Sequence, residues 1–497
     1  MAREIRGMAW TPPRGSETGD GRPWLRRGAG LLAAAAGFSF LAAAAVRRLN
    51  FDEPLALRAG FLSLAGIPGE PGFAMPFTLL LGAIGLGVPD PGLVFTLARL
   101  LVAGAVLASL AVSFRSADRT PGIVAAALLF SVANATFFVH GLEFRYDAAI
   151  LVLLLAALPL LVRGSDRSLL ALGAVAGLLA THHLKGAFFA AAVVGLTALR
   201  GGFRGLLRVA AGLVAALGAW VLVASATGVL PDVVGLYASF LEVAVDSERW
   251  SPWVVLKDAF RRDAAWWGLG LGASLWSLAS LAGLSREALR RSPDAWALGL
   301  AGAAASFLFI HPHPFAYMLA LPAPFVGFLA ARRLAAARPG TLAAAGLAAA
   351  LLLAGQGLLR PAPFSAHFAS FRAPRARQVE ALRWLKARSV PGDKVLDPSG
   401  LAYFLPPCTT QWYLDSMFER RAEAGAWMNE LRRSDFAACP WMVLTHRLNM
   451  LPRSVRLRLP EAYLPVREGI ALRVPDRRWA DPGIGKPAAA SNLESFW

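Results

Sequence analysis

The fold is decided where the first long apolar segment ends, in the stretch Arg47-Arg48-Leu49-Asn50-Phe51-Asp52-Glu53-Pro54. The apolar segment itself, near residues 29–47, is long enough to cross a bilayer, and the adjacent carboxylates of Asp52 and Glu53 follow it at the membrane surface. Two like charges this close repel each other, so at least one should meet a cation or accept a proton from a substrate. A solvated acidic loop is the alternative that this pair alone leaves open.

Composition predicts the class of protein. The chain is 56% hydrophobic and 16% charged, with a mean hydropathy of +0.51, and it contains many apolar runs of bilayer length. We therefore expect an integral membrane protein surrounded by membrane lipids. The formal net charge is +18, but the basic residues cluster in short connections between apolar runs and form no basic groove with interleaved aromatic residues. This pattern argues against nucleic-acid binding.

Placing the basic connections inside gives an alternation of about eleven crossings. Residues 1–28 form a cytoplasmic tail, residues 29–358 carry the crossings, and residues 359–497 follow on the far side. Segment 53–88 is interrupted by prolines and glycines, which predicts short helices along the interface. The expected spans lie near 29–47, 91–113, 121–138, 146–162, 168–181, 186–199, 209–227, 264–284, 295–310, 317–331 and 341–358.

The C-terminal part, residues 359–497, has a different sequence pattern from the apolar spans, and we expect it to form a small exported α/β domain. Its expected elements are helices at 375–388 and 416–433, strands at 394–397 and 441–445, and a β-rich end at 463–474. Cys408 and Cys439 are the only cysteines and both lie here, where a disulfide or two free buried thiols are equally open. The predicted fold class is an α-helical polytopic membrane protein with a small C-terminal α/β extracytoplasmic domain.

Charged residues at membrane depth are costly unless they are paired or face a wet cavity. Glu143, Arg145 and Asp147 stand two residues apart at the outer mouth of an expected span. If that span has already begun, only Glu143 and Asp147 share a face of the helix. An arginine held by acids could contact an anionic substrate, and a structural ion pair is the alternative.

A lysine and several histidines form a second group of candidates. Lys185 follows His182 and His183 at the tip of two short helices, where its charge could neutralise a phosphate or simply reach the interface. His311 and His313 flank a proline in a late outer loop and lack nearby acids, so ordinary loop histidines are favoured over metal ligands. No metal ligand set is assigned, and a cofactor or divalent metal requirement stays open.

The order of these features resembles the GT-C superfamily of polytopic glycosyltransferases. The likeness is to the bacterial branch similar to protein O-mannosyltransferases and lipid A aminoarabinose transferases, and it covers about residues 29–358. The stretches that carry it are Asn50–Arg58, Phe95–Leu101 with Arg99, Glu143–Asp147, Gly177–Ala180 leading to Lys185, and Pro314–Pro324.

The resemblance implies a sugar donor carried on a polyprenyl phosphate and an acceptor hydroxyl of a lipid, glycan or protein. Transfer would occur with inversion on the extracytoplasmic face of a bacterial inner membrane. Asp52 would be the general base and Glu53 would position it or share that role, while Arg145 and Lys185 stabilise the departing phosphate. The other residues expected to bind substrate are Arg58, Glu143, Asp147, His182, His313 and Tyr317.

Two other classes of function are weighed against this one. A transporter or flippase of a lipid-linked sugar predicts polar residues near the midplane and an internal repeat. Here the polar residues collect at outer mouths and no repeat is found. An assembly partner that works through its exported domain would not need charges at membrane depth. The sequence further predicts that Asp52, Arg145 and Lys185 face one cavity.

Overall fold

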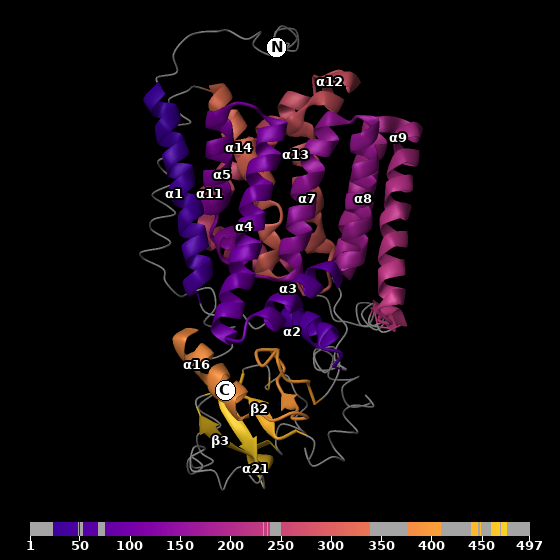
Figure 1. Cartoon of the computed structure of the whole chain (residues 1–497). Helices are drawn as coiled ribbons and strands as arrows, with labels where there is room; N and C mark the ends of the chain where they lie inside the picture. The colour runs from indigo at the N-terminus through magenta and orange to yellow at the C-terminus, as the bar shows by residue number, and fades with distance from the viewer. Residues whose placement is uncertain are drawn as a thin grey trace.

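This computed structural model shows a helical bundle with a small β-sheet beyond one of its ends (Figure 1). The structure describes residues 23–47, 49, 53–67, 75–231, 233–235, 237–238, 250–337, 375–408, 439–445, 448, 459–467 and 469–474. Within these residues, five helical segments are long and apolar enough to cross a membrane, namely 91–117, 146–163, 184–226, 293–310 and 316–337. The chain is therefore a multi-pass membrane protein, as its composition predicts. The count of about eleven crossings stays a prediction, and the span expected at 341–358 lies outside the described residues.

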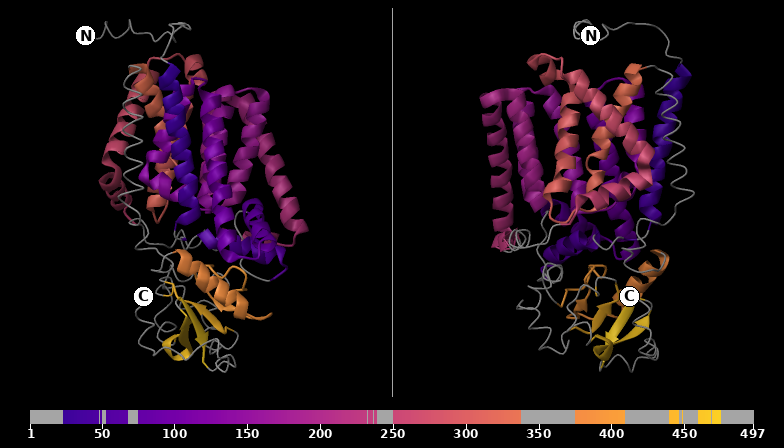
Figure 2. Two further views of the ribbon diagram at one scale, coloured as in Figure 1. Left: turned by 60° about the vertical axis from the view of Figure 1, so that its left-hand side comes forward. Right: turned by 180° about the vertical axis from the view of Figure 1, so that it is seen from behind.

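The bundle helices run roughly side by side (Figures 1 and 2). They are α1 (Pro23–Val46), α4 (Pro91–Ala117), α5 (Pro121–Ala133), α6 (Ala135–His140), α7 (Tyr146–Arg163), α8 (Asp166–His182), α9 (Leu184–Ala226), α11 (Pro252–Leu281), α13 (Pro293–Ile310) and α14 (Ala323–Ala337). The short α12 (Arg286–Arg291) lies at the end away from the sheet. At the other end, α2 (Glu53–Leu64) and α3 (Met75–Gly87) lie across the bundle, in the segment where short interfacial helices were predicted.

Local sequence signals set several helix ends. The side chain of Asp90 accepts a hydrogen bond from the Leu93 amide at 2.8 Å and Pro91 occupies the first position of α4, so the helix starts there. Ser165 caps α8 in the same way through the Ser168 amide. Helix α7 ends at Gly164, which adopts a left-handed φ of 57° that favours glycine.

Helix α9 is two antiparallel halves joined at Gly202, whose backbone (φ 58°, ψ −155°) is not helical. The first half returns from α8 through His183, so the predicted helical hairpin forms. Small residues allow α8 to pack closely against the second half, because a Cβ on Gly173 would lie 2.1 Å from the Val209 carbonyl oxygen. Helix α11 is also kinked, at Asp263.

The described residues of the C-terminal domain form the helix α16, a short helix and a mixed sheet. Its elements are α16 (Arg375–Arg388), β1 (Val395–Leu396), β2 (Trp441–Val443), α21 (Leu459–Ala462), β3 (Tyr463–Arg467) and β4 (Ile470–Arg473). The strand order is β1-β2-β4-β3, with β1 parallel to β2 and the other pairs antiparallel. Cys408 and Cys439 form a disulfide, which resolves that open alternative. The helix predicted at 416–433 lies outside the described residues.

Apolar packing joins the C-terminal domain to the bundle. Tyr403 places its ring edge-on to Phe61 of α2 and Phe95 of α4, with centroid distances of 5.4 and 5.6 Å. Tyr403, Leu382 and Trp441 belong to the same buried cluster as the bundle interior. The domain is thus seated directly on the end of the bundle that carries α2 and α3.

Candidate active site

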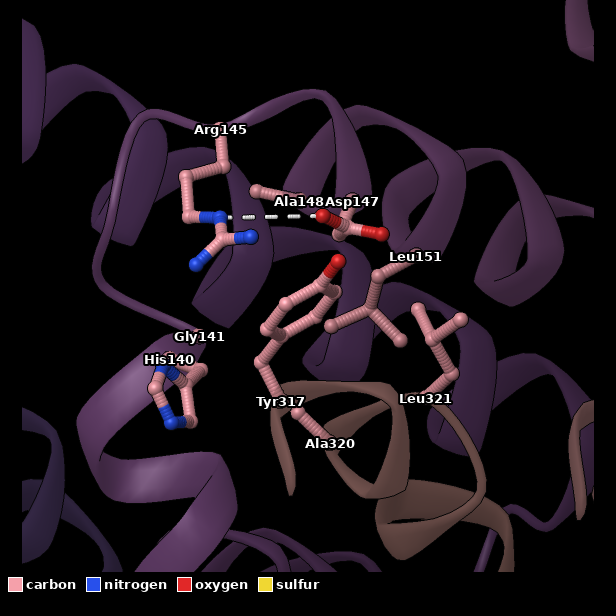
Figure 3. Close-up of a pocket in the computed structure, with 9 residues that line it drawn as sticks. All are labelled: His140, Gly141, Arg145, Asp147, Ala148, Leu151, Tyr317, Ala320 and Leu321. Atoms are coloured by element: carbon pink, nitrogen blue, oxygen red, sulfur yellow. Dashed lines mark ion pairs between the residues drawn. The ribbon is translucent and has the colours of Figure 1, made fainter. Parts of the chain in front are cut away.

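Five polar residues from three parts of the chain meet at the end of the bundle that faces the C-terminal domain. Arg145 caps the start of α7 and Asp147 lies in its first turn, while Glu143 precedes them in the loop. Lys185 is the second residue of α9, and Tyr317 lies on the 3₁₀ helix η2 (Ala316–Ala320). We call these five residues the outer cluster. Figure 3 shows three of them, Arg145, Asp147 and Tyr317, around one cavity.

The two cations of the outer cluster share one phenol ring. The Nζ of Lys185 donates to Tyr317 Oη at 2.9 Å and to Asp147 Oδ1 at 3.2 Å. The guanidinium carbon of Arg145 lies 3.8 Å from the centroid of the Tyr317 ring, close enough for a cation–π interaction. Arg145 Nε lies 3.7 Å from Asp147 Oδ2, and its Nη1 lies 3.7 Å from Glu143 Oε2. Tyr317 therefore holds both cations in one place.

The outer cluster is largely removed from solvent. The exposed fraction of the side chains is 14% for Asp147, 12% for Lys185, 8% for Arg145 and 6% for Glu143. Two cations balance two carboxylates, so the cluster is formally neutral when all four are charged. Because water screens these charges poorly, an anion placed beside the cations would interact with them strongly.

A narrow cavity opens beside these groups (Figure 3). Arg145, Asp147, Tyr317 and His140 supply its polar wall, and Leu151, Ala320 and Leu321 line the apolar side. His140 Nδ1 lies 2.9 Å from Glu143 Oε2. Sequence reasoning missed His140, although its position three residues before Glu143 was a signal that the two could meet.

The backbone brings Glu143, Arg145 and Asp147 together in a way that the sequence did not predict. The expectation that only Glu143 and Asp147 share a face assumed that the helix had already begun. That condition is not met, because α7 starts at Tyr146, where the span near 146–162 was expected, and Arg145 before it is extended (φ −96°, ψ 162°). An extended residue at the helix start directs the Arg145 side chain between both acids.

The predicted histidines make the following described contacts. His183 Nδ1 accepts the backbone amide of Lys185 at 3.1 Å. His182 is buried, and among the residues that the structure describes no group hydrogen-bonds to its Nδ1 atom. His313 packs its ring 4.7 Å from that of Trp250, and its amide donates to His311 Nδ1. Burial, reinforced by the charge of Lys185, lowers the pKa of His311 to about 4, so this ring is neutral near pH 7.

Glu53 is fully buried and paired. Its two carboxylate oxygens accept from Arg99 of α4, Oε1 from Nε at 2.7 Å and Oε2 from Nη2 at 2.5 Å. A bidentate ion pair of this kind fixes the orientation of both side chains. Arg99 Nη1 also donates to the carbonyl of Arg47 at 2.6 Å. Burial lowers the pKa of Arg47, and the charge of Glu143 opposes that shift.

Asp52 and Arg58 are the remaining predicted site residues. Asp52 lies outside the described residues, so its predicted place in one cavity with Arg145 and Lys185 stays a prediction. Arg58 is buried on α2 and its Nη1 donates to the backbone carbonyl of Asp397 at 2.9 Å, toward the C-terminal domain. Within the described part of the chain, no group of three or more His, Cys, Asp or Glu side chains is placed to hold a metal ion.

Comparison with known proteins relates the fold to one class of enzyme. No family model and no curated protein matches the sequence. Among solved structures, the chain aligns with the crystal structure of ArnT from Cupriavidus metallidurans bound to undecaprenyl phosphate, with a TM-score of 0.50 and 16% identity over 77% of this chain and 75% of that chain. The apo structure of the same protein aligns with a TM-score of 0.48 and 19% identity over 75% of this chain and 73% of that chain.

The chain therefore has the fold of this ArnT structure. ArnT itself is an aminoarabinose transferase, a GT-C glycosyltransferase. This confirms the resemblance that the order of sequence features predicted. At 16% identity the likeness establishes the fold alone.

Proposed function

We propose that this protein transfers a sugar from a polyprenyl-phosphate donor to an acceptor hydroxyl of a lipid, glycan or protein. The observation that carries the proposal is the pair of buried cations, Arg145 and Lys185, held over Tyr317 beside a cavity. The fold supports it, because the ArnT structure of similar fold holds undecaprenyl phosphate.

The outer cluster suits the leaving group of this reaction. When the bond between the anomeric carbon and the phosphate oxygen breaks, the electron pair stays on the phosphate and its negative charge grows. Arg145, Lys185 and the hydroxyl of Tyr317 are placed to stabilise that charge in a site from which water is largely excluded. Asp147 and Glu143 keep the two cations in position before the donor arrives. The unpartnered Nδ1 of the buried His182 is a further candidate for contact with the donor.

The acceptor half of the reaction needs a base. In this proposal the carboxylate of Asp52 takes the proton of the acceptor hydroxyl while the hydroxyl oxygen attacks the anomeric carbon opposite the phosphate, which inverts that carbon. Glu53, its neighbour in sequence, has both oxygens engaged by Arg99. That pairing suits Glu53 to positioning and leaves Asp52 as the candidate base.

The distribution of arginines supports an extracytoplasmic site. Arg163, Arg200 and Arg291 lie in or next to connections at the end of the bundle away from the C-terminal domain, and α12 marks this end in Figure 1. The positive-inside rule places such connections in the cytoplasm. The outer cluster and the C-terminal domain would then face the outside of a bacterial inner membrane.

A transfer assay tests the proposal. Wild type, Asp52→Asn and the matched control Asp166→Asn are reconstituted in liposomes with radiolabelled polyprenyl-phosphate sugars and membrane acceptors. Asp166 is a suitable control because its exposed carboxylate pairs with Arg208 at the other end of the bundle. We expect turnover by wild type and by Asp166→Asn, and loss of turnover with retained donor binding in Asp52→Asn. Absence of transfer by the wild type with every donor would contradict the proposal.

A further inference from the structure

Arg375, the first residue of α16, reaches from the C-terminal domain into the bundle. Its Nη1 lies 3.3 Å from the carbonyl oxygens of Ala44 and Arg47 at the end of α1, and its Nη2 donates to Thr96 Oγ1 at 2.5 Å. One guanidinium therefore ties the exit of α1 to α4. Arg375 and Arg47 are 328 residues apart in sequence, so this contact exists only when the C-terminal domain is docked on the bundle.

The carbonyl of Arg47 is held by two arginines. Besides Arg375, it accepts from Nη1 of Arg99, the same residue whose other nitrogens fork onto Glu53. The charges interact as well. Burial and the charge of Arg99 lower the pKa of Arg375 to about 10, and the charge of Glu53 opposes this shift. Arg375 is thus coupled to the Glu53–Arg99 pair by a shared acceptor and by charge.

A second residue of α16 contacts the same segment. Gln378 is fully buried, one turn after Arg375, and its Oε1 accepts the backbone amide of Leu49 at 3.3 Å. The described residues before Asp52, Arg47 and Leu49, are therefore bound by α16, and the residue after it, Glu53, is bound by Arg99.

The start of α2 also lies against the C-terminal domain. Arg58 donates to the carbonyl of Asp397, and Gly400 (φ 71°) lies so close that a Cβ there would be 3.3 Å from the Leu55 amide nitrogen. The domain therefore contacts the described chain before Glu53 through α16 and the chain after Glu53 through the loop that follows β1.

We infer that the C-terminal domain is a positioning element of the active site, in which Arg375 and Gln378 hold the chain that leads into Asp52 and Glu53. This inference rests on the proposed function for what is positioned, because a general base must be held within hydrogen-bond reach of the hydroxyl it deprotonates. Arg375 acts through Arg47 and Arg99 and is a positioning residue. A misplacement of about 1 Å can cost on the order of 100-fold in rate.

Hydrogen–deuterium exchange tests the positioning without any assay of activity. Full-length wild type, Arg375→Ala, Arg375→Lys, Gln378→Ala and the control Arg383→Ala are compared in lipid nanodiscs. Arg383 lies on the same helix but its partner is the exposed Asp90. We expect peptides that contain Leu49 to exchange about 10-fold faster in Arg375→Ala and Gln378→Ala, less so in Arg375→Lys, and at the wild-type rate in Arg383→Ala. Unchanged exchange in both Arg375→Ala and Gln378→Ala would overturn the inference.

Steady-state kinetics with a polyprenyl-phosphate sugar then tests the effect on the reaction. We expect kcat to fall about 10-fold in Arg375→Ala, with the KM for the donor within about 2-fold of wild type because the outer cluster is untouched. Arg375→Lys should recover part of the loss, and Arg383→Ala should match wild type. Faster exchange with unchanged kcat would overturn the positioning role. A wild type without transfer activity would overturn the proposed function alone, and the exchange difference would still decide whether α16 holds Arg47 and Leu49.

Discussion

Opposite ends of the bundle each carry a buried group of two cations and two carboxylates, and the two groups are built differently. At the end away from the C-terminal domain lie Asp118, Asp294, Arg332 and Arg333, which we call the inner cluster. Arg332 donates to Asp118 and, at 2.5 Å, to Asp294, while Arg333 donates to the second oxygen of Asp294. Each of these charges has a direct partner of opposite sign.

The remaining nitrogens of Arg333 also have protein partners. Nε of Arg333 donates to Ser277 Oγ at 2.8 Å and its Nη1 to Ser280 Oγ at 3.2 Å. These contacts join α11, α13, α14 and the end of α4 at one point. Forked hydrogen bonds of this kind fix helices relative to each other.

In the outer cluster, the cations face a ring and a cavity. Arg145 is 3.7 Å from both Glu143 and Asp147, beyond hydrogen-bond length for those pairs, and it stacks on Tyr317. Arg145, Asp147 and Tyr317 line the cavity (Figure 3). The comparison teaches that the residue types alone do not separate a structural ion pair from a binding site. Geometry does, since a cavity lies beside Arg145 in the outer cluster, whereas in the inner cluster each nitrogen of the Arg333 guanidinium donates to a protein group.

The largest effect should follow from breaking the inner cluster. Asp294→Ala removes the carboxylate shared by Arg332 and Arg333 and leaves Arg333 with hydroxyl partners among its described contacts. We expect a loss of about 3–5 kcal/mol in the free energy of unfolding, measured by denaturant unfolding in detergent. Turnover per folded molecule should be unchanged. Normal stability with lost turnover would instead give the inner cluster a part in the reaction.

Neutralising a cation of the outer cluster should affect the reaction and spare the fold. Lys185→Gln keeps a donor for Asp147 and Tyr317 but removes the charge. We expect sugar transfer to fall by about 100- to 1000-fold, the range seen when one group that stabilises developing negative charge is lost. Arg333→Gln is the matched control, and its turnover should stay near wild type. Equal losses in both variants would remove the distinction between the two clusters.

A smaller effect should follow from removing only the hydroxyl of Tyr317. Tyr317→Phe retains the ring beneath Arg145 and loses the 2.9 Å hydrogen bond to Lys185. Because a hydrogen bond to a charged group contributes about 1.5–3 kcal/mol, we expect at least a 10-fold fall in kcat. Stopped-assay kinetics measure it. A wild-type rate would show that the phenol serves only as a platform for the cations.

The smallest effect concerns the contact between Arg383 of α16 and Asp90 at the start of α4. The hydrogen bond from Arg383 holds the pKa of Asp90 below its usual range. The ionised carboxylate of Asp90 therefore stabilises the fold at a pH above its pKa in the unfolded chain, and this stabilisation is lost as the pH falls through the lowered pKa of the folded protein. The pair is solvent-exposed, so we expect at most about 1 kcal/mol. The free energy of unfolding of Asp90→Asn should be lower than that of wild type at neutral pH and equal to it in acid. If the two proteins still differ in stability in acid, the effect would belong to the cap that Asp90 provides for α4 and not to its ion pair with Arg383.

Much of the fold follows from the sequence for local reasons. Proline and polar caps mark helix starts, as at Asp90 and Pro91, and the helix predicted at 375–388 is α16 to the residue. The interruptions in segment 53–88 correctly predicted short helices. In each case the signal lies within a few residues of the feature.

The parts that could not be predicted depend on contacts distant in sequence. Glu53 and Arg99 are 46 residues apart, and Asp263 accepts the amide of Ala135 across 128 residues. Arg332 and Arg333 looked like an ordinary cytoplasmic connection because their partners lie on other helices. No local pattern reveals such pairings, which arise only when helices pack.

Binding of undecaprenyl phosphate to purified wild type, Lys185→Gln and Arg333→Gln tests the central claim most directly, and native mass spectrometry in detergent measures it. Our account predicts that wild type and Arg333→Gln bind alike, while Lys185→Gln binds at least about 10-fold more weakly because a charge-assisted contact to the phosphate is lost. Equal binding by all three proteins would contradict the claim that the outer cluster is the phosphate site.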